Sequence, residues 1–223
     1  MLCQTLAALY SHASLAITSV AEPGVDLALA SRGVSPTVII SSAETLRSLH
    51  DAETAGISNA LQKFAHVSQS QAMSAGRMPT DTLLFRLFGP RGGAAGTTPG
   101  KLRLILVSQR LEAGSPILSS TMLSDLRIFT RARICYALGA DKVAGAVAQT
   151  NLYDYRSNDR PRFGHFGPPV SSVEVKLLAK DDKQVDGNSP SGALHVAGPA
   201  VAEGQATTGI SMAFAEDCTL RYA

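Results

Sequence analysis

A β-branched run followed directly by a helix cap is the feature that most limits what this chain can fold into. Residues 37–40 read Thr-Val-Ile-Ile, a pattern typical of a buried strand. Ser42 then precedes Ala43 and Glu44, where its side chain can cap a helix over residues 45–51. A strand that leads straight into a helix, repeated along a chain, predicts an α/β sheet flanked by helices.

The same alternation continues to about residue 161. Apolar periodicity predicts helices over 2–11, over 25–32 with Gly33 ending that helix, over much of 54–88 with breaks at Gly76 and Pro79, and over 118–131, the last as a surface helix. We expect strands at 15–20 and 102–107, with Cys135 buried in another strand. Residues 89–100 are rich in glycine and proline and predict a loop. The apolar side chains expected to pack near the end of the 54–88 region are Leu83, Leu84, Leu87 and Phe88.

The pattern changes after Pro161. Short β-like runs at 172–178 and 193–197 are separated by the turn-rich segment 180–191. The sequence therefore predicts an α/β part over 1–161 and a small β subdomain over 162–223, which ends at 219–222 as if a strand were cut or the protein stopped early. Whether this subdomain is complete stays open.

Charge and cysteine usage exclude several classes of partner and location. The 20 basic and 18 acidic residues give a net charge of +2 and are scattered, so nucleic acid is not an expected partner. Three widely separated cysteines form no disulfide framework, which favours a reducing, intracellular and most simply cytoplasmic location; peroxisomal or membrane-peripheral placement stays open. We find no signal peptide, and no uncharged apolar run approaches the length of a membrane span.

A short motif carries the clearest resemblance to a known family. Residues 147–151, Val-Ala-Gln-Thr-Asn, stand where adenylate-forming enzymes have Tyr-Gly-x-Thr-Glu. The flanking segments agree in order: 102–108 upstream, and Gly-Pro-Pro at 167–169, 174–176 and 198–199 downstream. The chain thus resembles the AMP-binding superfamily, and its long-chain acyl-CoA synthetases in particular. The resemblance implies half of the large N-terminal domain of such an enzyme, followed by a small β-barrel-like subdomain.

The resemblance also implies where a nucleotide would contact this chain. The expected cofactor-binding residues are Ser108, Gln149, Thr150 and Asn151. In the family the motif's threonine touches phosphate and its glutamate brings negative charge to Mg²⁺; here Thr150 retains the hydroxyl, and Asn151 offers only a neutral carbonyl.

Other positions depart from the family pattern. Val147 replaces the aromatic ring that packs on adenine, and Ile210 replaces the aspartate that binds the ribose. Gln109 and Arg110 have large side chains at positions where the family has small residues that leave room for the adenine. We therefore expect weakened nucleotide binding.

No residue is assigned a catalytic or metal-binding role. The family's phosphate loop and catalytic lysine have no counterpart, and residues 95–101 imitate that loop but in the wrong order, so a solvated linker is the better interpretation. The five histidines show no metal spacing and are expected at surface or capping positions. Residues 153–160 form either a polar recognition loop or an ion-pair cluster that shapes a turn.

Three functional hypotheses follow. The leading one is a divergent, truncated relative of acyl-CoA synthetases that is not catalytically competent alone and serves as a weak binding domain, for a fatty acyl chain or a nucleotide, or as an interaction domain. The second is a region of an active long-chain fatty acid-CoA ligase that works through an acyl-adenylate with ATP and Mg²⁺. The third is a structural module that forms a homo-oligomer or binds a missing-domain partner through uncovered sheet edges.

Overall fold

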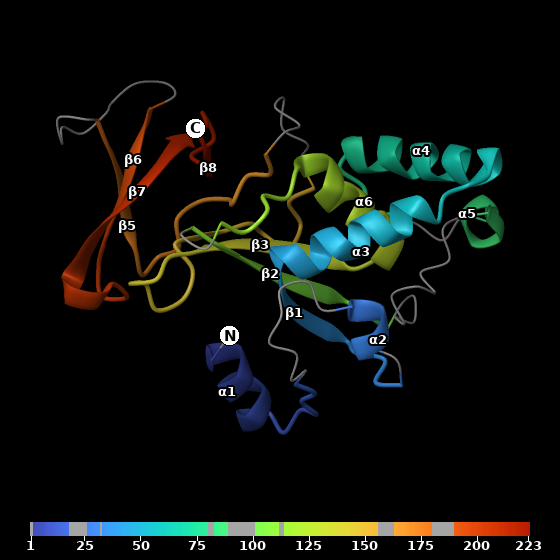
Figure 1. Cartoon of the computed structure of the whole chain (residues 1–223), viewed down its shortest axis with the longest axis horizontal. Helices are drawn as coiled ribbons and strands as arrows, with labels where there is room; N and C mark the ends of the chain where they lie inside the picture. Colours follow the sequence, from blue (N-terminus) through green and yellow to red (C-terminus); the bar gives the residue numbers. More distant parts are fainter. Residues whose placement is uncertain are drawn as a thin grey trace.

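The computed structural model describes residues 2–17, 26–31, 33–79, 83–88, 101–111, 114–155, 163–179 and 190–223. The first part of the chain contains α1 (Leu2–Tyr10), α2 (Leu27–Ser31), β1 (Val38–Ser42), α3 (Ala43–Ala55), α4 (Ala60–Ser74), α5 (Leu83–Phe88), β2 (Leu104–Arg110), α6 (Ser120–Thr130), β3 (Arg133–Gly139) and β4 (Ala148–Gln149) (Figure 1). The second part contains β5 (Glu174–Leu178), β6 (Ser191–Ala197), the 3₁₀ turn η1 (Ala202–Gly204), β7 (Gln205–Phe214) and β8 (Leu220–Tyr222).

The first sheet has the strand order β1-β2-β3-β4. The first three strands run parallel, and the short β4 runs antiparallel to β3. Side chains of the row formed by Ile39, Ile105 and Ile134 are buried with Leu46 of α3 and Leu126 of α6. The predicted partly parallel sheet flanked by helices is therefore confirmed.

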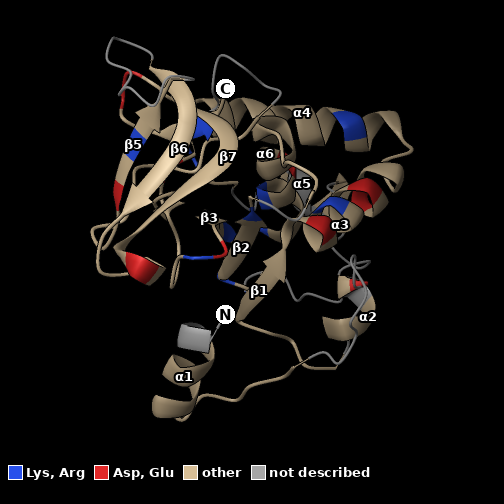
Figure 2. Ribbon diagram, turned by 60° about the vertical axis from the view of Figure 1, so that its left-hand side comes forward, with Lys and Arg blue, Asp and Glu red and all other residues tan. Residues whose placement is uncertain are grey.

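The second sheet is a curled antiparallel one, with the order β5-β6-β7-β8. Its first two strands coincide with the predicted runs at 172–178 and 193–197. Its longest strand, the ten-residue β7, was not predicted, because the small and polar residues at 205–209 hide the alternation typical of a half-buried strand. Figure 2 shows the curled strands β5, β6 and β7 as a sheet distinct from that of β1, β2 and β3.

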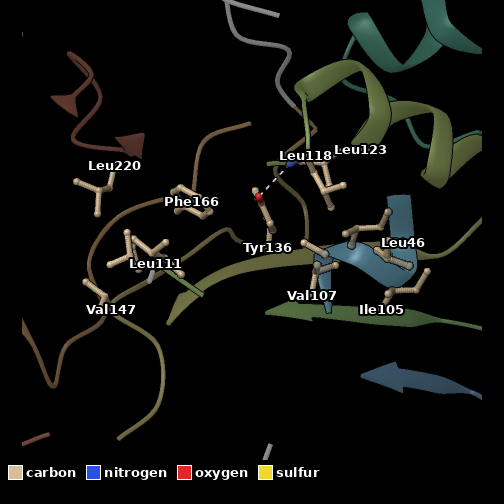
Figure 3. Packing of buried hydrophobic residues seen from close by; sticks show 14 of the residues in the cluster. Leu46, Ile105, Val107, Leu111, Leu118, Leu123, Tyr136, Val147, Phe166 and Leu220 are labelled. Atoms are coloured by element: carbon tan, nitrogen blue, oxygen red, sulfur yellow. Dashed lines mark hydrogen bonds between the residues drawn. The ribbon is translucent and has the colours of Figure 1, made fainter. Parts of the chain in front are cut away.

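One apolar core joins the two sheets. The Tyr136 ring of β3 lies 4.7 Å from the Phe166 ring, and Phe166 lies 5.4 Å, edge on, from Tyr222 of β8. Figure 3 shows Phe166 between Tyr136 and Leu220. The core cluster thus extends without interruption from Leu46 to Leu220, across the predicted domain boundary at 161/162, and that division itself stays a prediction.

Local signals in the sequence place two helix ends correctly. The Ser42 hydroxyl accepts a hydrogen bond from the Thr45 amide at the start of α3, as the cap pattern predicts. Gly33 has φ +81°, a left-handed conformation that suits a glycine after α2. None of the described helices is long and apolar enough to cross a membrane.

Several expectations were wrong. Of the strand expected at 15–20, residues 15–17 form none, and Leu15 and Ile17 are exposed; residues 18–20 lie outside the described residues. α6 is buried rather than a surface helix, because it lies between the first sheet and α4.

The end of the 54–88 region also differs from expectation. Leu83 and Leu87 of α5 are 77% and 61% exposed instead of packed, and Phe88 is exposed as well. The Leu84 side chain and residues 89–100 lie outside the described residues.

The burial of α6 predicts a large stability difference between two leucine truncations. Leu126→Ala removes a fully buried side chain and is expected to lower the free energy of unfolding by about 2–5 kcal/mol. The matched control Leu61→Ala, on the exposed side of α4, should change it by less than about 0.5 kcal/mol. Urea unfolding followed by circular dichroism measures both, and equal effects would contradict the described packing of α6.

Candidate functional site

Two of the four expected cofactor-binding residues meet in one row of the first sheet. Ser108 pairs with Ala137, and Ala137 pairs with Gln149, so Ser108 and Gln149 lie on either side of one residue. Both side chains are exposed, on the face opposite the buried isoleucine row. This row lies near the carboxyl ends of the parallel strands, where open α/β sheets bind their ligands.

Thr150 follows directly but its side chain is used inside the protein. It is 3% exposed, and its hydroxyl oxygen accepts a hydrogen bond from the Tyr136 amide at 2.8 Å. The Thr150 amide donates to the Tyr136 carbonyl at 3.0 Å, and the Cys135 thiol lies 3.0 Å from the Thr150 carbonyl. The hydroxyl expected to touch phosphate therefore extends the backbone pairing of β3.

Asn151 is exposed and stabilises a turn. Its side-chain carbonyl accepts a hydrogen bond from the Tyr153 amide two residues later at 3.0 Å, the usual pattern of an Asx turn. The Tyr153 ring in turn lies 4.8 Å from the Arg133 guanidinium. One lone pair of the Asn151 oxygen is thus already in use, which leaves the other for a ligand.

The residue at the adenine-stacking place is part of the core. Val147 is fully buried, and it belongs to the same cluster as Leu111, Phe166 and Leu220 (Figure 3). A large ring could not replace it without moving these neighbours, since protein interiors are close-packed.

Gln109 faces away from Ser108, into the helix-covered side of the sheet. Its side-chain oxygen accepts a hydrogen bond from the Tyr136 hydroxyl at 2.9 Å, and its side-chain nitrogen donates to the Ser115 carbonyl at 3.2 Å. The Tyr136 oxygen accepts from the Leu118 amide at 3.3 Å. Burial raises the pKa of Tyr136 above its ordinary value, so the hydroxyl stays protonated and can donate to Gln109.

The remaining positions of the family pattern lie elsewhere. Arg110 is exposed, 3.2 Å from Asp141. Ile210 lies in β7, partly buried against the core, and the neighbouring Thr208 hydroxyl donates to the Leu194 carbonyl at 3.2 Å. In the segment 95–101, which is similar to the family's phosphate loop, only Lys101 belongs to the described residues, and it is exposed.

The structure holds two histidine groupings, one half-buried and one buried, that sequence reasoning missed. His50 and His66, 12% and 18% exposed, both contact the carboxylate of Asp125. His165 is buried as well; its Nδ1 accepts from the Gly167 amide, and its Nε2 lies 3.7 Å from Asp154. The expectation of surface or capping positions did not include the contacts with Asp125 and Asp154, because these carboxylates lie well apart from the histidines along the chain and linear spacing carries no signal of them.

Two further features bear on ligand binding. Within the described ranges, no group of three or more His, Cys, Asp or Glu side chains is arranged to hold a metal ion. A hollow of about 430 Å³ lies between the connection that follows β3 and the turn before β7, and none of the four candidate residues lines it. Its lining consists of residues 141–144 and 199–202.

The hydrogen bond from the Tyr136 amide to Thr150 predicts a structural cost for removing the hydroxyl. Thr150→Val keeps the shape of the side chain but leaves a buried amide without an acceptor, and should lower the free energy of unfolding by about 1–3 kcal/mol. Thr150→Ser keeps the oxygen and should cost clearly less. Urea denaturation of both variants tests this, and equal stability of Thr150→Val and the parent chain would refute the assigned role.

Comparison with solved structures identifies the fold. Unliganded O-succinylbenzoate coenzyme A synthetase (MenE) from Bacillus subtilis is 14% identical over 100% of this chain and 38% of its own, with a TM-score of 0.58. The anthranilate CoA ligase AuaEII, in complex with anthranoyl-AMP, is 15% identical over 95% and 34% of the two chains, with a TM-score of 0.59. ATP-bound MatB from Rhodopseudomonas palustris is 13% identical over 98% and 36%, with a TM-score of 0.58.

The sequence comparisons add no closer relative. No protein-family model matches the chain, and no curated protein sequence matches it either. At 13–15% identity the structural likeness shows the fold alone. The chain spans little more than a third of the length of these enzymes, and over that length it has the α/β and curled antiparallel fold of the N-terminal domain of adenylate-forming enzymes.

Proposed function

We propose that this chain is a divergent AMP-binding, acyl-CoA synthetase-like domain that does not form acyl-adenylates alone and acts as a weak ligand-binding or interaction domain. One observation carries the proposal: two of the motif positions that would hold a nucleotide have their side chains engaged within the protein. The hydroxyl of Thr150 is bonded to the Tyr136 amide, and Val147 is packed in the core.

The burial of Thr150 is a reason to expect that phosphate would bind only weakly here. Its hydroxyl could still donate a hydrogen bond, but at 3% exposure a phosphate group has no direct approach. Moving the side chain outward would leave the Tyr136 amide unpaired, at a cost of about 1–3 kcal/mol. That cost would be subtracted from whatever the phosphate contact contributes.

The chemistry of the neighbouring positions supports the same conclusion. Asn151 carries no charge, so a Mg²⁺ ion brought by ATP would gain only a neutral oxygen there. Ile210 cannot accept hydrogen bonds from ribose hydroxyls, and it packs against the apolar core. On this proposal the chain is a non-catalytic member of its fold class, at work inside the cell and most simply in the cytoplasm.

A second candidate is a region of an active long-chain fatty acid-CoA ligase. The exposed row formed by Ser108 and Gln149 favours it, because this row lies at the sheet edge where a nucleotide would be expected. In that case Asn151 would hold Mg²⁺ through water. The phosphate loop and the catalytic lysine would have to come from outside the 223 residues.

A third candidate is a structural oligomerisation module. Exposed apolar side chains recur along α4 at Leu61, Phe64 and Val67, and such patches commonly mark interaction surfaces. Light scattering over a wide concentration range separates this candidate from the first, because an oligomerisation module should gain mass with concentration.

Isothermal titration tests the leading proposal. We expect no heat from the purified chain with ATP and Mg²⁺, or with a stable acyl-adenylate analogue, at ligand concentrations of about 1 mM. Micromolar binding of the analogue that Thr150→Ala or Asn151→Ala weakens would instead support the ligase candidate. Arg103→Ala, an exposed change outside the candidate site, is the matched control for non-specific loss of binding.

A further inference from the structure

Three helices converge on one carboxylate. Asp125 of α6 lies with its Oδ2 3.1 Å from His50 Nε2 of α3 and its Oδ1 3.1 Å from His66 Nε2 of α4. The three side chains are 12–18% exposed, so water screens the contacts only partly. The Phe129 ring, one turn further along α6, lies 5.5 Å from the His66 ring and 6.2 Å from the His50 ring.

The two ring nitrogens of His50 face two different carboxylates. Nε2 meets Asp125, and Nδ1 lies 3.3 Å from Asp51 Oδ1. A neutral imidazole has one N–H donor and one lone pair, so it would turn a lone pair toward one of these acceptors. Only the doubly protonated imidazolium donates to both, and the geometry therefore matches a positively charged His50.

We propose that the junction of α3, α4 and α6 is a pH-sensitive contact: a protonated His50 bridges Asp51 and Asp125 and holds the junction together, and the junction loosens when the pH rises and His50 loses its proton. This inference is independent of the proposed function, since it involves none of the candidate nucleotide-binding residues.

The packing of α4 makes it the element that should respond. Its buried apolar side chains, Ala65 and Met73, belong to a small cluster with Ile128 and Tyr155 rather than to the large core shared by the two sheets. Asp125 is shared between His50 of α3 and His66 of α4, so a shift of its carboxylate when His50 loses its proton also disturbs the contact between α4 and α6, whereas the sheets keep their own core.

The surrounding charges agree with this assignment. Asp51 contributes from α3, Asp125 from α6 and His66 from α4, and the Thr54 hydroxyl lies 3.5 Å from His50 Nε2. The hydrogen bond to Asp125 raises the pKa of His50 above its ordinary value. Burial alone would raise the pKa of Asp125, but its contacts with the two histidines lower it overall. His66 is close enough to Asp125 for an ion pair, although its N–H is not aligned for a hydrogen bond.

The signs of these shifts define the pH window. A raised folded-state pKa of His50 stabilises the folded protein fully below about 6.5, and this contribution disappears as the pH rises through the folded value. A lowered pKa of Asp125 stabilises it above about 3.8, and that contribution disappears as the pH falls. The junction should be tightest between these two limits.

Proton titration of the histidine ring signals by NMR tests the charge of His50 directly. We expect the His50 midpoint to lie above the ordinary histidine value of about 6.5. Asp125→Asn should lower the His50 midpoint, because an amide does not stabilise the imidazolium as a carboxylate does. Replacing each histidine in turn by glutamine assigns the signals. A His50 midpoint at or below that ordinary value would overturn the proposal.

Hydrogen exchange tests the effect on α4. Amide protection of residues 60–74, corrected for the intrinsic pH dependence of exchange, should fall between about pH 5.5 and pH 8.5, while protection in β6 and β7 stays constant. His50→Gln should remove this pH dependence, and His195→Gln should leave it intact. If Asp125→Asn does not fold, the parent chain and His50→Gln still decide the matter: an unchanged pH response in His50→Gln excludes the bridge.

Discussion

Tyr136 is the residue on which the two halves of this structure depend. Its backbone pairs with β2 and with Thr150, its ring packs on Phe166, and its hydroxyl links Gln109 to the Leu118 amide. The backbone contacts position the candidate site, and the contacts of the ring and hydroxyl join the sheets into one core. A change at the site is therefore coupled to the core through a single strand.

Strong local signals made much of the first half predictable. The run at 37–40 and the cap at Ser42 specify their own conformations, and the structure has β1 and α3 there. The burial of α6 could not be predicted in this way, because its sequence is amphipathic enough for a surface helix and only the positions of α4 and the sheet bury both of its sides. The strand β7 was missed because it carries no clear apolar pattern. It forms through the pairing of its polar residues with β6.

The location of the candidate site could be predicted from the sequence, but the contacts of its side chains could not. The order of the motifs located Ser108 and Gln149, and the parallel register brings them together. Nothing in the sequence indicated that the Thr150 hydroxyl would bond the Tyr136 amide, fourteen residues away, or that Gln109 would turn inward. His50, His66 and Asp125 lie on three helices, so their meeting depends on tertiary packing alone.

The register of the first sheet has a consequence for the order of folding. Val38 pairs with Leu104, 66 positions later, whereas Val196 pairs with Ala206 only ten positions later. Closing the longer loop costs more chain entropy before any contact repays it, so parallel pairing of this kind is slow to form. The β6–β7 hairpin can arise locally and early, and the parallel strands should join afterwards. Until the parallel strands join, apolar strand edges in the first half stay open to other chains. The faster this half folds, the better the protein is protected from aggregation.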